Sequence, residues 1–377
     1  MTNYNYTFDP DWVSPPGETI ADLLEEKDLT EADLVKDLDC TIEDISELIN
    51  GKAAITKDTA AKLSRVLGST ERFWLEREAQ YRAALAKIAE AERLESWVDW
   101  LDEFPVKELQ KAGQISDCRL DSRNKPRVVQ ELLQLFGVAS PDQWRACYGN
   151  LAVSFRRSRT GQDNTGAIIT WIRLGEIKVE NLNCPQFNRA KFEEAVQEIR
   201  TLTVLPPEYF LPRLQQLCCQ AGVLWVLVEK IPRAGVSGLA RWLDHDRPLI
   251  QMSLYGKTND RFWFTFFHEA AHILLHDDKK GKDAIFLDDW EQGKKLESAQ
   301  EREANEQARD WLIPADAEYE EELYSIHSKE KVKAFADKLG IHPGIVVGRL
   351  QHEEKIPYKD MNGLKHKLTA DLIQLLH

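Results

Sequence analysis

The sequence predicts an α+β protein that is mainly helical over its first two-thirds and has a small β-sheet near its C-terminal end. Helical patterns with capping residues recur from residue 16 to about residue 220. Short apolar segments interrupted by Pro or Gly follow, as expected for strands. An aromatic run that contains His-Glu-x-x-His comes next, and it predicts a buried helix.

With 377 residues the chain is too long for one ordinary core. We expect three regions, residues 1–80, 81–215 and 216–377. No run of eighteen apolar residues is present, so we expect no membrane contact. No basic, apolar leader opens the chain, so we expect a cytoplasmic protein.

The six cysteines include no Cys-x-x-Cys pair, which favours reduced thiols over a disulfide framework. We expect the adjacent Cys218 and Cys219 to be packing residues. The net charge of −14 argues against a protein that coats nucleic acid non-specifically.

Four short helices are predicted in residues 1–80. The first surrounds Ile20 to Leu24, and three more are expected at Glu31–Leu38, Thr41–Ile49 and Thr56–Leu67. This succession, with Asn50-Gly51 between the later helices, resembles the helix-turn-helix of phage-repressor-like (XRE) proteins. The flanking sequences, Pro16-Gly17-Glu18 and the segment from Ile55 to Trp74, resemble HigA-type antitoxins more specifically.

The helix expected to enter the DNA major groove carries Glu43, Asp44 and Glu47 and has no Lys or Arg. Residues 1–80 hold 18 Asp and Glu and 8 Lys and Arg, a balance of −10. Phosphates repel carboxylates, which disfavours DNA binding. Contacts to phosphate remain open for Lys52, Lys57, Lys62 and Arg65. The alternative is a domain that docks a protein or forms a homodimer.

A long helix is predicted from Glu71 to about Arg93, because Ala, Glu, Arg and Leu dominate there. Further helices are expected at Val128–Phe136, after Ser140, and at Ala167–Arg173, Phe192–Leu202 and Tyr209–Gln220. No catalytic pattern is evident in this middle region. Three strands are then predicted at Val223–Val228, Gly238–Leu243 and Pro248–Leu254.

His268, Glu269 and His272 form the His-Glu-x-x-His motif. On a helix, residues four apart lie on one face, so the two imidazoles can bind one zinc ion. Glu269 can then act as the base that takes a proton from an attacking water. Burying these groups among aromatic residues is costly unless a metal compensates.

A third ligand is expected from the helix predicted at Leu296–Leu312, where Glu301, Glu303, Glu306 and Asp310 are candidates. The segments Trp263–His276 and Glu303–Pro314 resemble the ImmA/IrrE family of zincin-like metallopeptidases. The end of that family's domain also resembles Gly340–His352. The resemblance implies that Glu303 completes the zinc site, with Glu306 as the alternative.

Three further side chains are candidates for supporting roles. His276, four residues beyond His272, could stabilise an oxyanion, orient a ligand or cap its helix. Asn305 or Asp310 could orient a ligand through a hydrogen bond.

By resemblance, the chain is a zinc-dependent endopeptidase that cleaves a regulatory protein, a helix-turn-helix repressor or a toxin–antitoxin partner, in a stress or mobile-element programme. The alternative is a non-catalytic HigA-type antitoxin that represses its own promoter and uses the zincin fold as a scaffold. The intact His-Glu-x-x-His motif favours the enzyme, and the acidic recognition helix weighs against the repressor.

Overall fold

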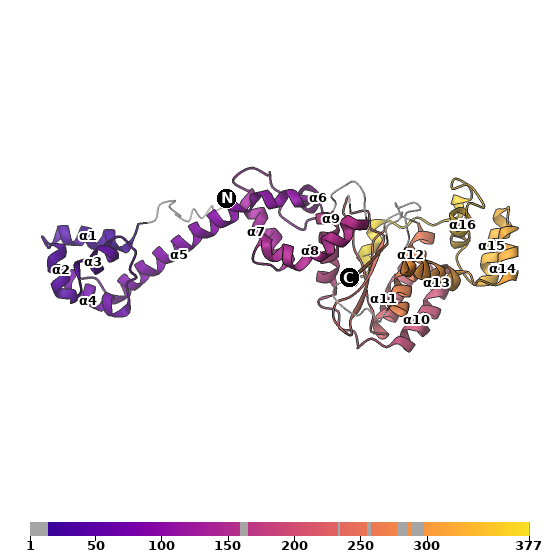
Figure 1. Ribbon diagram of the computed structural model, residues 1–377, viewed down its shortest axis with the longest axis horizontal. Helices are drawn as coiled ribbons and strands as arrows, with labels where there is room; N and C mark the ends of the chain where they lie inside the picture. The colour runs from indigo at the N-terminus through magenta and orange to yellow at the C-terminus, as the bar shows by residue number, and fades with distance from the viewer. Residues whose placement is uncertain are drawn as a thin grey trace, which may run out of the picture. The chain divides into compact units, whose positions relative to one another are not determined.

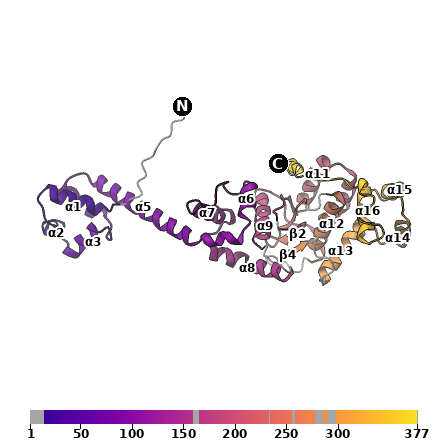
Figure 2. The same ribbon diagram turned by 90° about the horizontal axis from the view of Figure 1, so that it is seen from above.

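The computed structural model describes residues 14–158, 165–232, 234–254, 258–276, 285–288 and 298–376 (Figures 1 and 2). The chain divides into two units, residues 1–99 with 120–129, and residues 100–119 with 130–377. The three regions expected at 1–80, 81–215 and 216–377 stay a prediction.

The first unit contains a bundle of short helices followed by one long helix. The side chains of Thr30 and Thr41 each accept a hydrogen bond from the amide three residues later. The carboxylates of Asp33 and Asp44 accept one from the amides of Thr30 and Thr41, which completes two capping boxes. Ile20, Leu34, Ile45, Leu63 and Trp74 are fully buried at its centre. The helices are α1 (Pro16–Glu26), α2 (Glu31–Leu38), α3 (Ile42–Ile49), α4 (Lys57–Leu67) and α5 (Glu71–Ser96), as the sequence predicts.

The helices that follow α5 in the sequence pack around an aromatic cluster. The rings of Trp100, Phe104, Phe136, Trp144 and Tyr148 lie within 6 Å of one another in successive pairs. The elements are η1 (Val98–Glu103), α6 (Val106–Lys111), α7 (Lys125–Phe136), α8 (Pro141–Ser158), α9 (Thr165–Val179), α10 (Arg189–Thr201), η2 (Leu202–Val204) and α11 (Pro207–Gln220).

A four-stranded sheet follows, with strand order β1-β3-β2-β4. The three predicted strands are confirmed as β1 (Leu224–Leu227), β2 (Gly238–Trp242) and β3 (Pro248–Met252). β1 and β3 are parallel, whereas β2 runs antiparallel to both of its neighbours. The fourth strand, β4 (Ile285–Asp288), is not among the strands predicted from the sequence.

Helices cover both faces of this sheet (Figure 1). Trp225, Ala240 and Ile250 point into a core shared with α10, α11 and α12 (Asn259–Leu275). On the other face, Gln251 donates a hydrogen bond to the carbonyl of Trp171 in α9. The α+β class is therefore confirmed, and α12 lies directly under the sheet.

The remaining elements surround the end of α12. They are α13 (Ala299–Leu312), α14 (Ala317–Tyr324), α15 (Lys329–Leu339), α16 (Pro343–His352), η4 (Asn362–Leu364) and η5 (Ala370–Leu376). Ala304 and Ala308 of α13 are fully buried, and their small side chains allow α13 to pack closely along α12. Among the described residues, no helix combines the length and the hydrophobicity needed to cross a bilayer.

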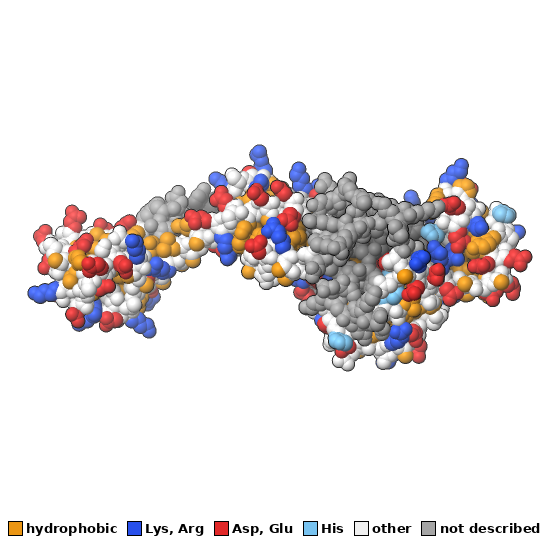
Figure 3. Space-filling model, in the orientation of Figure 1, with side chains coloured by type: hydrophobic (Ala, Val, Ile, Leu, Met, Phe, Trp, Pro, Cys, Tyr) orange, Lys and Arg blue, Asp and Glu red, His pale blue; other side chains and the backbone are white. Residues whose placement is uncertain are grey.

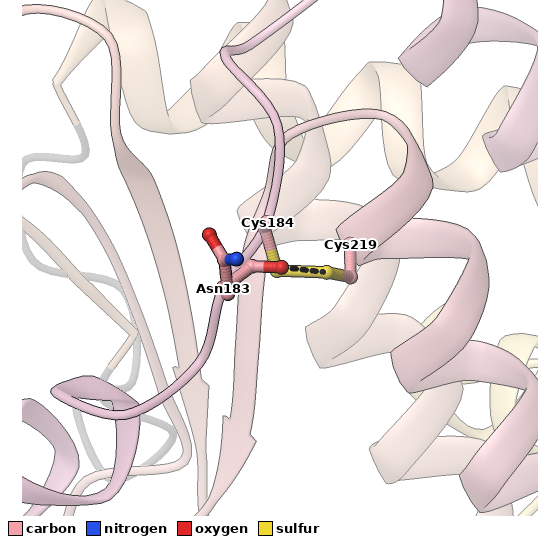
Figure 4. The surroundings of a disulfide bond; sticks show 3 residues. All are labelled: Asn183, Cys184 and Cys219. Carbon is pink, nitrogen blue, oxygen red and sulfur yellow. Dashed lines mark hydrogen bonds between the residues drawn. A yellow bond between two sulfur atoms is a disulfide. The ribbon is translucent and has the colours of Figure 1, made fainter.

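The prediction that all cysteines are reduced is wrong for one pair. A disulfide joins Cys184 to Cys219 at the end of α11, with 5.1 Å between their Cα atoms (Figure 4). Cys218 is a packing residue as expected, since it is fully buried. Adjacent helical residues point in different directions, so Cys219 instead meets the segment that precedes α10.

Candidate metal centre

Three side chains from two helices converge beneath the sheet. Nε2 of His268 and Nε2 of His272 lie 3.1 Å apart on successive turns of α12. Oxygen atoms of Glu301 lie 3.2 Å from the first nitrogen and 3.4 Å from the second. All three groups lie within 4.8 Å of one another, as a metal-binding set requires.

The carboxylate beside the two imidazoles differs from the one that the resemblance implies. Glu301 lies in the first turn of α13, where Ser298 caps the helix by accepting a hydrogen bond from the Glu301 amide at 3.1 Å. Glu303 lies two residues further and points away, with 62% of its side chain exposed. The structure thus places Glu301, and not Glu303, beside the two imidazoles, and Glu306 is exposed as well.

The electrostatics suit a ligand set. Burial lowers the pKa of His272 to about 4, which keeps this imidazole neutral and able to offer a lone pair. Burial opposes the charge of Glu301, but its hydrogen bonds with His268 and His272 outweigh this and hold the pKa of the carboxyl well below its usual range. Two imidazoles and one carboxylate together form a donor set that zinc commonly takes.

Comparison with known proteins agrees with both parts of the chain. Residues 224–351 match the IrrE N-terminal-like domain of peptidase family M78. The uncharacterized HTH-type transcriptional regulator YddM of Escherichia coli K12 is 32% identical over 78 residues, which are 21% of this chain and 78% of the relative. The chain is a helix-turn-helix family member with an IrrE-like peptidase domain.

In the IrrE-like domain, Glu269 lies between α12 and strand β2. Its side chain is fully buried. A Cβ atom at Gly238 of β2 would lie 2.5 Å from Oε1 of Glu269 and 2.5 Å from Cγ2 of Thr265. Only glycine therefore leaves room for the carboxylate, and no motif in the sequence marks Gly238 for this role.

His276 extends the site towards solvent. Its Nδ1 lies 3.1 Å from Nδ1 of His272, and its Nε2 lies 3.1 Å from Oε2 of Glu303. Glu303 also lines a surface hollow of about 540 Å³. Of the three roles considered for His276, these contacts favour orienting a ligand, and His276 is also the C-cap residue of α12.

The two remaining candidates lie beyond Glu301 along α13. Asp310 accepts a hydrogen bond from the Ala315 amide at 2.8 Å, nine residues and about 13 Å along the helix from Glu301. Asn305 is half-buried one turn beyond Glu301. A supporting role for Asn305 stays a prediction, whereas the Asp310 carboxylate binds the backbone of the segment that follows α13.

Glu301 could have been found from the helical periodicity of its segment. Residues 301, 304, 308 and 312 share one face of α13, and the last three are Ala304, Ala308 and Leu312, which are buried. A ligand that faces α12 must lie on this apolar face. Glu303 and Glu306 do not, because they are two and five positions further on.

The basic residues considered for DNA binding do not form one free surface. Nζ of Lys62 donates to the carbonyl of Leu38 at 2.8 Å and pairs with Asp58 at 3.1 Å. Lys52, Lys57 and Arg65 are exposed. On the face seen in Figure 3, acidic side chains alternate with Lys and Arg over the helices of this bundle, so no continuous basic patch is visible.

Proposed function

We propose that this chain is a cytoplasmic zinc endopeptidase that cleaves a regulatory protein, either a helix-turn-helix repressor or a toxin–antitoxin partner. His268, His272 and Glu301 would hold the zinc ion, and Glu269 would be the catalytic base. The IrrE-like domain supports peptidase activity in general terms. The metal, the residue roles and the substrate class are the proposal.

The separations within the ligand set carry this proposal. Zinc bonds of about 2.0–2.2 Å at tetrahedral angles separate neighbouring ligand atoms by about 3.3–3.5 Å. The two imidazole nitrogens lie 3.1 Å apart, one carboxylate oxygen of Glu301 lies 3.2 Å from that of His268, and the other oxygen lies 3.4 Å from that of His272. Little rearrangement is needed to accept the ion, which leaves a fourth position for water and substrate.

A zinc ion held there would supply Lewis-acid polarisation of the scissile carbonyl and would make an attacking water more acidic. Glu269 takes the proton of that water as the new carbon–oxygen bond forms. It then gives the proton to the nitrogen of the leaving amine as the carbon–nitrogen bond breaks. Gly238 has no Cβ and so leaves the space beside β2 that the Glu269 carboxylate occupies.

His276 and Glu303 would fix the tautomer of His272. To offer its Nε2 lone pair, His272 must carry its proton on Nδ1, which can donate to Nδ1 of His276. His276 then carries its proton on Nε2 and donates to Glu303. This chain of hydrogen bonds orients His272 from outside the ligand set.

The helix-turn-helix would recruit the protein substrate. Along α2 and α3 the exposed residues include Glu31, Asp37, Asp39, Glu43 and Glu47. Such a face attracts a basic protein surface and repels DNA phosphates. Ile42 is also 47% exposed there, which adds an apolar contact point.

The test is a comparison of wild type with Glu269→Gln, measuring zinc content and cleavage of candidate repressor proteins. Glu269→Gln is expected to keep one zinc per chain and to lose cleavage by a factor of about 10³ or more, because the base is gone while the ligands remain. His272→Ala is the companion variant, which is expected to lose both. Cleavage retained by Glu269→Gln would refute the assigned base.

One other function has a specific observation behind it. The similarity to a helix-turn-helix transcriptional regulator favours an antitoxin that represses its own promoter, with the IrrE-like domain as a scaffold. In that case the purified, folded chain would hold no zinc and would bind its own operator. The acidic α3 argues against this alternative.

A further inference from the structure

The outer edge of β2 is next to the proposed catalytic base. Gly238 is the first residue of this strand and lies against the side chain of Glu269, so closely that a Cβ atom at position 238 would not fit. β3 occupies one edge of β2, and the other edge runs from Gly238 to Arg241. An extended polypeptide that paired with this second edge would pass beside Glu269.

The chain's own β4 already occupies that edge. It pairs antiparallel with β2 over four residues, with Gly238 opposite Asp288, Leu239 opposite Leu287, Ala240 opposite Phe286 and Arg241 opposite Ile285. β4 comes from the connection between α12 and α13, the two helices that carry the proposed ligands. The strand therefore lies where an added peptide strand would bind.

The hydrogen bonds of β2 alternate between its two neighbours. The amide of Ser253 donates to the carbonyl of Ser237, and the amide of Leu243 donates to the carbonyl of Arg247. The backbone N–H and C=O groups of the odd-numbered residues of β2 thus point towards β3. Those of Gly238 and Ala240 therefore point towards β4. By the same alternation, the amide of Phe286 points towards β2 and the amide of Leu287 points away from it.

The site beside this edge is closed. His268, Glu269 and His272 are each at most 1% exposed. A polypeptide can reach the Glu269 carboxylate only if some of the groups that cover it move. Extended peptides commonly bind proteins by adding a strand to a sheet edge, and here the edge is taken.

We propose that β4 is an internal substitute for the substrate. In the resting chain it holds the edge of β2, and the polypeptide to be cleaved replaces it there as an antiparallel strand. This inference rests on the proposed peptidase function and adds two features to it. The substrate is bound as an extended segment, and the resting enzyme is inhibited by its own strand.

A four-residue strand suits such an exchange. Its pairing with β2 spans only four residues, so few backbone hydrogen bonds hold it at the edge of the sheet. A longer substrate strand would form more backbone hydrogen bonds to the same edge. Replacement would thus break the few backbone hydrogen bonds between β2 and β4 and form at least as many between β2 and the substrate. β3 would still hold β2 in place.

The first test is residue-resolved hydrogen exchange of the full-length Glu269→Gln chain. The amides of Gly238 and Ala240 are expected to exchange at least about tenfold faster than those of Leu239 and Arg241, because β4 detaches more readily than β3. Equal, slow exchange at all four amides would mean that β4 is a permanent strand and would overturn the proposal.

Two proline variants give a matched pair for the second test. Phe286→Pro removes an amide that faces β2, whereas Leu287→Pro alters the same strand at an amide that faces away. In the Glu269→Gln background, only Phe286→Pro should lose the remaining protection of Gly238 and Ala240. Casein, an unfolded polypeptide, should restore that protection when it is added.

Cleavage of labelled casein completes the experiment with Glu269 present and zinc supplied. Phe286→Pro is expected to raise the rate by about tenfold if roughly one resting molecule in ten has an open edge, and Leu287→Pro should leave it unchanged. Equal rates in both variants would overturn the inhibitory role. If casein restores the protection but no zinc-loaded variant cleaves it, the peptidase function fails while strand replacement stands.

Discussion

Glu301 and Glu303 are two residues apart in α13, yet their surroundings differ in ways that matter for a metal. Glu301 bridges the two imidazoles of α12, and its side chain is 28% exposed. Glu303 contacts only the outer histidine, His276, among the histidines of the site. A direct ligand and an outer hydrogen-bond partner should therefore respond differently to truncation.

Glu301→Ala is expected to abolish stoichiometric zinc binding, because two protein ligands hold the ion only loosely. Glu303→Ala should keep one zinc per chain and weaken zinc affinity by about tenfold, the effect of removing an outer partner. Metal analysis of both purified variants, followed by competition with a chelator, would measure this. Zinc lost from Glu303→Ala alone would restore the assignment implied by the family resemblance.

His342 is a second residue with a clear prediction. Its Nδ1 accepts hydrogen bonds from the Gly344 amide and from Nδ2 of Asn259. Burial, with help from the nearby His366, lowers the pKa of His342 from 6.5 to about 4. Between pH 4 and pH 6.5 the unfolded chain binds the proton of His342 more readily than the folded chain does. The contribution of His342 to stability is therefore fully present above pH 6.5 and declines as the pH falls towards 4.

His342→Asn should remove this contribution, because Asn can still accept a hydrogen bond but cannot take a proton. Between pH 7 and pH 4.5, we expect the free energy of unfolding to fall by about 1–2 kcal/mol less in the variant than in wild type, with partial solvent exposure taken into account. Urea unfolding at both pH values would measure the difference. An unchanged pH dependence would show that His342 does not control acid stability.

Among the elements, α13 and α15 depend on a single arginine of α10. Nε of Arg200 donates to the carbonyl of Trp311 at 2.7 Å, and Nη2 donates to that of Leu312 at 3.1 Å. Nη1 donates to the carbonyl of Leu339 at 2.9 Å. One guanidinium thus satisfies carbonyls that two helix ends leave without an intrahelical partner.

Arg200→Met is expected to lower the free energy of unfolding by about 2–3 kcal/mol, because it leaves three carbonyls unsatisfied in a half-buried place. Arg189→Met on the same helix is the control. Arg189 forms an exposed pair with Glu193, and such pairs contribute less than about 1 kcal/mol. Equal losses in the two variants would refute the capping role of Arg200.

The elements themselves were largely predictable from local sequence. Thr30, Thr41, Thr56 and Thr70 each accept a backbone hydrogen bond at a helix start, so the sequence signal for those helices is a physical contact. β4 was not predicted, because its apolar run, Ile285-Phe286-Leu287, is only three residues long and is followed directly by acidic residues. Its strand conformation depends on the edge that β2 offers.

For the molecule as a whole, the negative charge of the helix-turn-helix domain predicts that its partner is a protein and not DNA. The recognition helix has no basic residue, and Lys62 is already bonded to Leu38 and Asp58. We expect the full-length chain to bind its own promoter DNA no more tightly than about 10⁻⁵ M at 150 mM salt, with a shallow salt dependence.

A titration at several salt concentrations would test this expectation. The control is Glu43→Lys with Glu47→Lys, which should strengthen binding and steepen its salt dependence by about two phosphate contacts. Nanomolar affinity of the wild type with a steep salt dependence would contradict the prediction. It would favour the autorepressor alternative.

The sequence by itself determined the helical pattern, the three main strands and the His-Glu-x-x-His pair on one helix face. Those features depend on caps, periodicity and residue spacing, which act over a few residues. The tertiary structure decided which glutamate meets the imidazoles, which cysteines pair and which strand lies on the edge of β2. These outcomes depend on how α12, α13 and the sheet pack, because side chains far apart in sequence meet only when their elements do.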